Sequence, residues 1–130
     1  MTSSPCPFCE IPKSRIVAQN SHAFWIHDGY PVSPGHSLVI PKRHVGSFFD
    51  VSKDERESLL ALLEHAKAAS VVSFNPDGFN IGINDGPAAG QTVPHLHIHL
   101  IPRFVDDVAD PRGGIRWVIP AKADYWSQRD

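Results

Sequence analysis

Three histidines, His95, His97 and His99, stand two residues apart in the stretch QTVPHLHIHLIPR, residues 91–103. On an extended strand, residues two apart project from the same face and lie about 6.6 Å apart. Neighbouring imidazoles can bind a metal ion, or one can act as a nucleophile while the others position and protonate a substrate. A merely polar face would be served as well by Thr, Lys or Glu, so the pattern indicates a functional site.

The loop before these histidines, NDGPAAGQT (84–92), is rich in small residues. Its backbone N–H groups and the side chains of Asn84, Gln91 and Thr92 are suited to holding phosphate oxygens, as is the close approach that Gly90 permits. The Gly-Lys-Ser/Thr of a P-loop is absent. A plain connection between strands would explain this loop by itself, but beside the histidines it predicts a phosphate-sized pocket.

Cys6 and Cys9 form a C-x-x-C pair and are the two cysteines of the chain. Such a pair can be half of a zinc site, a redox pair, or two incidental thiols. A redox pair usually opens a helix after a strand, and the Pro-rich start of this chain predicts a loop instead. A zinc site would need two more ligands, which the eight histidines could supply.

Length and composition predict one globular domain with no membrane span. The chain has 130 residues, 42% of them hydrophobic and 20% charged, with a net charge of -2. This balance argues against a surface that coats nucleic acid. The N-terminus lacks the basic and apolar regions of a signal peptide, so we expect a cytoplasmic location.

Short apolar runs predict a mostly antiparallel α+β fold, because consecutive strands lie too close for helical crossovers. The clearest helix is 51–74, where Ser52 and Glu55 form a capping box ahead of apolar residues at helical spacing. The predicted strands are 15–19, 23–28, 36–42, 79–85 and 94–102, with a last short one at 116–120.

The stretch HLHIHLI, together with PVSPGHSLVIPKRHV (31–45), resembles the histidine triad (HIT) superfamily over residues 6 to 104. The resemblance implies an antiparallel sheet of about five strands, with one long helix and a short one. It implies a single HIT domain over 1–130, with a Cys-containing loop at 1–14 and a C-terminal extension at 105–130. Family members are typically homodimers that join their sheets.

The resemblance also implies a nucleotidyl hydrolase or transferase that acts on a purine nucleotide or dinucleotide. His97 would attack the α-phosphate to form a covalent nucleotidyl-histidine, which water then cleaves to release a nucleoside monophosphate. His99 would contact the phosphate, and His36 would pack against the triad. The residues expected to bind substrate are Asp28 at the ribose, Ile26 and His27 at the base, and Asn84, Gly90, Gln91 and Thr92 at the phosphates.

Members with this C-x-x-C resemble zinc proteins, which implies a structural zinc held by Cys6, Cys9, His44 and His95. Two enzyme branches fit the sequence: a hydrolase of dinucleoside polyphosphates of the Ap3A or Ap4A type, and a Hint-like hydrolase of nucleoside phosphoramidates. Two alternatives stay open, a non-catalytic zinc-stabilised nucleotide-binding module and a metal-dependent hydrolase that uses all three histidines. The extension could reach distal phosphates through Arg112, Arg116 and Lys122, or it could form a dimer interface.

Overall fold

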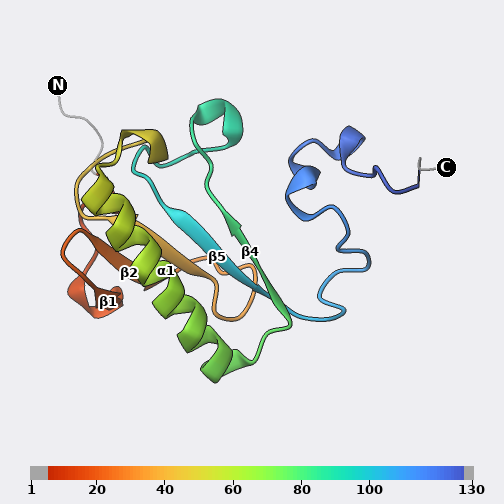
Figure 1. Cartoon of the computed structure of the whole chain (residues 1–130), viewed down its shortest axis with the longest axis horizontal. Helices are drawn as coiled ribbons and strands as arrows, with labels where there is room; N and C mark the ends of the chain where they lie inside the picture. Colours follow the sequence, from red (N-terminus) through yellow and green to blue (C-terminus); the bar gives the residue numbers. More distant parts are fainter. Residues whose placement is uncertain (1–5, 128–130) are drawn as a thin grey trace.

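The computed structural model describes residues 6–127, which form a five-stranded sheet with one long helix on one face (Figure 1). The first five residues of the predicted N-terminal loop and the last three of the predicted extension lie outside the described residues. Every neighbouring pair of strands is antiparallel, and the strand order is β1-β2-β3-β5-β4. The elements are β1 (Ile16–Gln19), β2 (Ala23–His27), β3 (Ser37–Pro41), α1 (Lys53–Phe74), β4 (Gly78–Gly82) and β5 (Ile98–Arg103).

Helix α1 begins as the sequence predicts. The Ser52 hydroxyl accepts a hydrogen bond from the Glu55 N–H, and the Glu55 carboxylate accepts one from the Ser52 N–H, which completes the capping box. The helix packs on β2, β3 and β5, and the predicted apolar stripe supplies Leu59, Leu62 and Ala66 to the core. Asn75, in the left-handed conformation, ends the helix.

The opposite face of the sheet carries a second, smaller apolar cluster of Phe24, Ile26, Leu38 and Ile40. Alternating residues of β2 and β3 point to this face, as the period of two in a strand requires. The N-terminal segment covers the cluster with the side chains of Phe8, Ile11 and Ile16. The two cysteines therefore belong to a segment that lies directly over this face.

The histidine strand is shorter than predicted, because β5 begins at Ile98 and not at residue 94. Leu96, Ile98 and Leu100 are buried in the main core, as expected. The His95 carbonyl accepts a hydrogen bond from the His97 ring rather than from a neighbouring strand. The first two histidines therefore precede the regular ladder.

The predicted strand at 116–120 is wrong. This segment forms two short 3₁₀ helices, Gly114–Val118 and Pro120–Lys122. Gly113 and Gly114 have φ of 90° and 46°, and the Arg116 guanidinium donates to the carbonyl of Ala123 at 3.1 Å. The short helical elements among residues 6–127 are all 3₁₀ helices of three to five residues.

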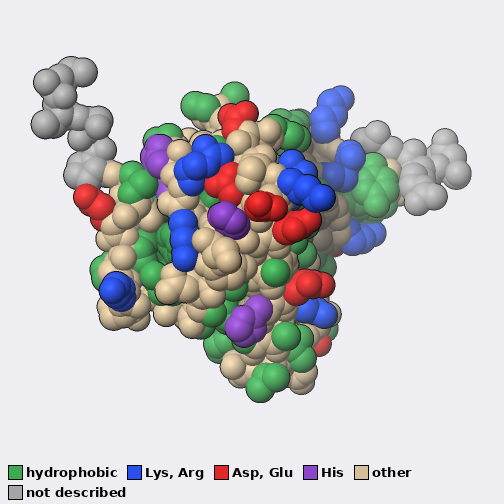
Figure 2. All heavy atoms as spheres, turned by 60° about the vertical axis from the view of Figure 1, so that its left-hand side comes forward, with side chains coloured by type: hydrophobic (Ala, Val, Ile, Leu, Met, Phe, Trp, Pro, Cys, Tyr) green, Lys and Arg blue, Asp and Glu red, His purple; other side chains and the backbone are tan. Residues whose placement is uncertain are grey.

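Acidic and basic side chains are interspersed over the face shown in Figure 2, with no stripe of one sign. The arrangement agrees with the small net charge of -2. Among residues 6–127, no helix is long and apolar enough to cross a membrane.

Candidate active site and metal centre

The three histidines of the predicted triad lie within the second face of the sheet rather than on an open surface. His95 is fully buried, His97 is 9% exposed, and His99 is half-buried. Their neighbours are the N-terminal segment and His36, which immediately precedes β3. A buried imidazole needs a hydrogen-bond partner, and that partner determines which ring nitrogen holds the proton.

His95 points toward the two cysteines. Its Nε2 lies 2.8 Å from the Pro41 carbonyl, which can only accept, so the proton is on Nε2 and the Nδ1 lone pair is free. Nδ1 lies 3.4 Å from Cys6 Sγ and 3.5 Å from Cys9 Sγ. His44 completes the group, with its Nδ1 at 3.2 Å from Cys9 Sγ.

These four residues fit a zinc ion. A tetrahedral zinc about 2.3 Å from sulfur and about 2.0 Å from nitrogen separates its sulfur and nitrogen ligands by about 3.5 Å. The sulfur–nitrogen distances of 3.2 to 3.5 Å agree, and all four ligand atoms lie within 4.8 Å of one another. The hydrogen bond from His95 to a backbone carbonyl is also the outer contact that zinc-binding histidines usually make. The four predicted ligands are therefore brought together.

His97 has the opposite tautomer. Its Nδ1 lies 2.9 Å from the His95 carbonyl, so Nδ1 carries the proton and donates it. The Nε2 lone pair is then free. The ring of Phe8 contacts His97 edge-on, with ring centroids 4.9 Å apart. His97 thus offers an unprotonated nitrogen from a ring held by a backbone bond and an aromatic contact.

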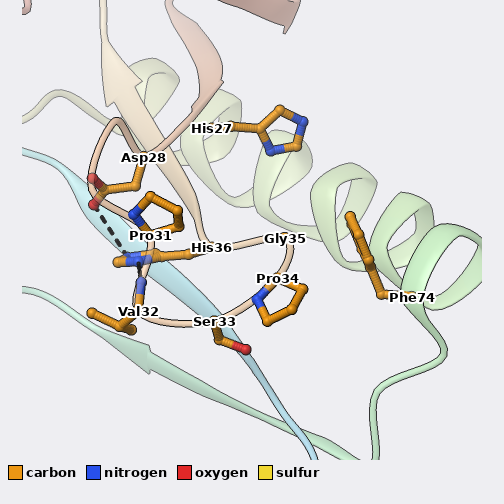
Figure 3. A pocket seen from close by; sticks show the side chains of 9 residues that line it. All are labelled: His27, Asp28, Pro31, Val32, Ser33, Pro34, Gly35, His36 and Phe74. Carbon is orange, nitrogen blue, oxygen red and sulfur yellow. Dashed lines mark hydrogen bonds and ion pairs between the residues drawn. The ribbon is translucent and has the colours of Figure 1, made fainter.

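His99 is joined to His36 and Asp28. His36 Nε2 lies 3.0 Å from His99 Nδ1 and 3.3 Å from Asp28 Oδ2. The second nitrogen of His36, Nδ1, accepts from the Val32 N–H at 3.2 Å. Figure 3 shows the contact between Asp28 and His36, at the two ends of the loop that joins β2 to β3.

The surroundings favour neutral imidazoles. Burial lowers the pKa of His99 to about 4, and the positive charges that His97 and His36 could carry act in the same direction, while Asp28 opposes them. Burial also lowers the pKa of His36, again against Asp28. His99 and His36 are therefore uncharged near neutral pH.

The two predicted base-binding residues, Ile26 and His27, lie on opposite faces of the sheet. Ile26 is fully buried in the cluster on the triad side of the sheet. His27 is exposed and points to the other face, beside Trp25, with ring centroids 6.0 Å apart. Figure 3 shows His27 directed away from Asp28 and His36. The structure does not bring His27 to the triad.

The predicted phosphate-binding loop contains a 3₁₀ turn at Pro87–Ala89. Asn84, Gly90 and Thr92 are exposed. Gln91 instead braces the loop, because its Oε1 accepts from the Gly86 N–H at 2.8 Å and its Nε2 donates to the Gly46 carbonyl at 2.9 Å. In this conformation its amide holds the loop closed.

Several groups at the site were not predicted from the sequence. Phe8, the Pro41 carbonyl and the Val32 N–H each fix one histidine ring, yet two of them are backbone groups without a side-chain signature. A cavity of about 460 Å³ lies beside the loop of residues 31–35. It is lined by His27, Asp28, Pro31, Val32, Ser33, Pro34, Gly35, His36 and Phe74, and none of the three triad histidines borders it.

Comparisons with known proteins agree with this geometry. Residues 10–106 match the family model described as HIT domain. A crystal structure of a HIT family protein from Bacillus anthracis is similar with a TM-score of 0.73 and 36% identity, covering 79% of this chain and 76% of that one. An uncharacterized HIT-like protein of Mycoplasma genitalium is 35% identical over 107 residues, 79% of this chain and 76% of that protein. A bis(5'-adenosyl)-triphosphatase of Dictyostelium discoideum is 41% identical over 93 residues, 72% of this chain and 62% of that protein.

Proposed function

The chain belongs to the HIT domain family, and we propose that it cleaves dinucleoside polyphosphates at an α-phosphate and releases a nucleoside monophosphate. Its similarity to a bis(5'-adenosyl)-triphosphatase supports this substrate class. The observation that carries the proposal is the hydrogen bond of 2.9 Å from His97 Nδ1 to the His95 carbonyl. That bond leaves Nε2 as an unprotonated nucleophile beside a loop of phosphate-binding character.

In the first step the Nε2 lone pair of His97 attacks the α-phosphorus. The new N–P bond forms as the P–O bond to the remaining nucleotide breaks, and the leaving oxygen departs with the electron pair. The ring then carries a positive charge, because Nδ1 keeps its proton. The His95 carbonyl accepts that proton's hydrogen bond and stabilises the cation.

In the second step water attacks the same phosphorus. The N–P bond breaks, its electron pair returns to Nε2, and the proton from water passes to solvent, so the product is a nucleoside monophosphate. Neutral imidazole is a good leaving group from the cationic adduct, which makes this step easier than hydrolysis of the original anhydride. His97 ends in its starting tautomer.

The neighbours of His97 supply binding and charge stabilisation. His99 donates a hydrogen bond to a phosphate oxygen as negative charge develops there. The exposed Asn84, Thr92 and the backbone at Gly90 take the remaining oxygens. Asp28, at the end of β2, accepts from the ribose hydroxyls, and the base lies near the apolar cluster that contains Ile26.

We infer that the Cys6, Cys9, His44 and His95 group holds a structural zinc. When bound, such an ion ties the N-terminal loop to the sheet and has no open position for substrate. The loop in turn keeps Phe8 against the nucleophile's ring. The ion takes no part in the chemical steps.

The test is chromatographic product analysis of the wild type and His97→Ala with diadenosine triphosphate, diadenosine tetraphosphate and an adenosine phosphoramidate. His65→Ala is the matched control, because His65 is an exposed histidine on α1. We expect the wild type and the control to release AMP from the dinucleotides, and His97→Ala to lose this activity while keeping its circular dichroism spectrum. Acid quenching during turnover should trap an adenylate on the wild type.

Other results would change the assignment. Cleavage of the phosphoramidate alone would assign the chain to the Hint-like activity. Equal activity in His97→Ala would refute the nucleophile. Nucleotide binding without turnover of any of the three compounds would favour the non-catalytic module.

We also propose that the protein is a homodimer that joins the sheets of two copies. A cytoplasmic location stays a prediction, which cell fractionation would test.

A further inference from the structure

We propose that Asp28 is a positioning residue, which acts on the reaction through His36 and so sets the hydrogen-bonding state of His99. This inference rests on the proposed function. It adds to the contact with ribose a second role for the same carboxylate. The carboxylate would help to keep the proton of His99 on Nε2, where it can be donated to the reacting phosphate.

The backbone places Asp28 and His36 side by side. They continue the pairing of β2 with β3, in which His27 stands opposite Ser37. The Asp28 N–H donates to the His36 carbonyl at 2.9 Å, which holds the two residues together. The Asp28 carboxylate is oriented by the Tyr30 N–H, which donates to Oδ1 at 2.8 Å. The other oxygen, Oδ2, lies 3.3 Å from His36 Nε2.

The Val32 N–H determines which ring nitrogens of His36 and His99 carry protons. Because the Val32 N–H donates to His36 Nδ1, that nitrogen holds a lone pair and the single ring proton is on Nε2. His36 Nε2 then donates to His99 Nδ1 at 3.0 Å, while the negative charge of Asp28 Oδ2 lies 3.3 Å from the same nitrogen. His99 Nδ1 is consequently an acceptor, and the proton of His99 is on Nε2, free to donate to substrate.

Asp28 provides the only carboxylate among residues 6–127 that converges with His36 and His99 in one cluster of ligand-type groups. The other titratable groups that face His99 are the imidazoles of His97 and His36, which disfavour positive charge on it. His99 can donate to a phosphate oxygen through Nε2 only while that nitrogen carries the ring proton. The Asp28 carboxylate favours this tautomer, because its charge holds the proton of the 4% exposed His36 on Nε2, the nitrogen that faces His99 Nδ1.

A double-mutant cycle, measured with two substrates that differ in their ribose hydroxyls, separates this role from ribose binding. Asp28→Asn, His36→Leu and the double variant are assayed with diadenosine triphosphate and with its 2',3'-dideoxyadenosine analogue. We expect Asp28→Asn to lower kcat by on the order of 10-fold or more on both compounds. In the His36→Leu background the same change should cost less than about 3-fold, because its route to His99 has been removed.

A pure ribose contact makes the opposite predictions. The effect of Asp28→Asn would then fall mainly on KM, vanish with the dideoxy analogue, and persist in the His36→Leu background. Any of these three results would overturn the proposal.

Ring nitrogen-15 NMR of the wild-type protein supplies a readout independent of turnover. The proposal requires the Nε2–H tautomer at both His36 and His99, and a preference at His99 that weakens in Asp28→Asn. An Nδ1–H tautomer at His99 would overturn it, as would an unchanged preference in Asp28→Asn. If the wild type cleaves neither compound but shows these tautomers, the proposed function fails while the positioning by Asp28 stands.

Discussion

Each of the three triad histidines has a different hydrogen-bond partner, which determines the ring nitrogen that carries its proton. His95 donates through Nε2 to the Pro41 carbonyl, and His97 donates through Nδ1 to the His95 carbonyl. His99 accepts at Nδ1 from His36. Under the proposed function, identical residues two apart would act as a metal ligand, a nucleophile and a hydrogen-bond donor. The tautomers are set by two backbone carbonyls and one neighbouring imidazole, which residue type alone does not encode.

The neutral histidines predict a stability that falls in mild acid. Burial lowers the pKa of His99 from 6.5 to about 4, so between these values the unfolded chain binds a proton that the folded protein does not. The free energy of unfolding therefore rises with pH through this window, levels off above about pH 6.5, and is lost as pH falls toward 4. We expect the urea midpoint to drop between pH 7 and pH 5, and to drop less in His99→Gln.

The comparison variant for this measurement is His65→Gln, which changes an exposed histidine of α1 and should keep the wild-type slope. Acid release of a bound metal would affect all three proteins alike, so the difference between slopes isolates His99. Equal slopes in the wild type and His99→Gln would contradict the prediction.

At the scale of the elements, the sequence predicted well where local pattern and tertiary packing agree. The capping box at Ser52 and the apolar stripe of α1 predicted the helix, short apolar runs predicted β2 and β3, and an alternating run predicted β4. The segment predicted as a strand at 116–120 contacts the edge strand β4 but forms 3₁₀ helices instead. Val118 and Ile119 stay 74% and 58% exposed, and a guanidinium bonded to backbone carbonyls stabilises tight turns instead.

The candidate site was also predictable only in part: residue types were, but contacts between distant segments were not. Histidines and cysteines have distinctive types, and the four predicted metal ligands lie within 4.8 Å of one another as the sequence predicted. Placement of His27 depended on the register of β2, where a difference of one residue moves a side chain to the other face. The role of Gln91 as a loop brace depended on a contact with the Gly46 carbonyl, which is distant in sequence.

The N-terminal loop leads to a prediction about metal content. Cys9→Ser removes one of the four converging ligand atoms, whereas Ser14→Ala changes an exposed serine of the same segment. We expect about one zinc per wild-type chain and per Ser14→Ala chain, and a clear loss of zinc in Cys9→Ser, by elemental analysis after dialysis. Thermal unfolding of Cys9→Ser should begin at lower temperature, since the loop over the second face is no longer anchored. Full zinc content in Cys9→Ser would contradict the assignment.

The start of α1 gives a second prediction at this scale. Glu55 accepts from Arg43 Nη2 at 2.7 Å and Nε at 2.9 Å, and its side chain is 6% exposed. These bonds, led by the one from Arg43, hold the pKa of Glu55 at about 2, so this stabilisation is present above about pH 4.5 and is lost as pH falls toward 2. We expect Glu55→Gln to lower Tm at pH 7 by about 3–6 °C. Glu57→Gln, on the exposed side of the same turn, should change it little, and equal shifts would refute this role for the ion pair.

At the scale of the whole molecule, the two edges of the sheet are unlike. β1 is four residues long and its pairing with β2 contains a register shift, a feature that protects an edge from further pairing. β4, at the other edge, pairs regularly with β5 along its whole length. Helix α1 packs on β2, β3 and β5, and Ile81 of β4 is 54% exposed.

The C-terminal extension adds apolar surface beside the β4 edge of the sheet. In Figure 1 it runs past β4, and its first 3₁₀ helix, Gly114–Val118, contacts that strand. Ile115, Val118 and Ile119 are each more than half exposed, and the segment is held in shape by Arg112 and Arg116 stacked on Trp126 and Tyr125. A rigid apolar segment beside an open strand is a surface that a second copy could cover.

These two features predict a dimer that joins through β4 and not through β1. Sedimentation of the wild type should give twice the chain mass of 14.3 kDa. Ile81→Lys places a charge on the β4 edge and should shift the protein toward the monomer, because a buried, unpaired ammonium is costly. Val17→Lys makes the same change at a 44% exposed position of β1 and should leave the dimer intact. Loss of the dimer in Val17→Lys alone would place the interface on the other edge, and a monomeric wild type would mean that the exposed side chains of β4 and the extension face solvent.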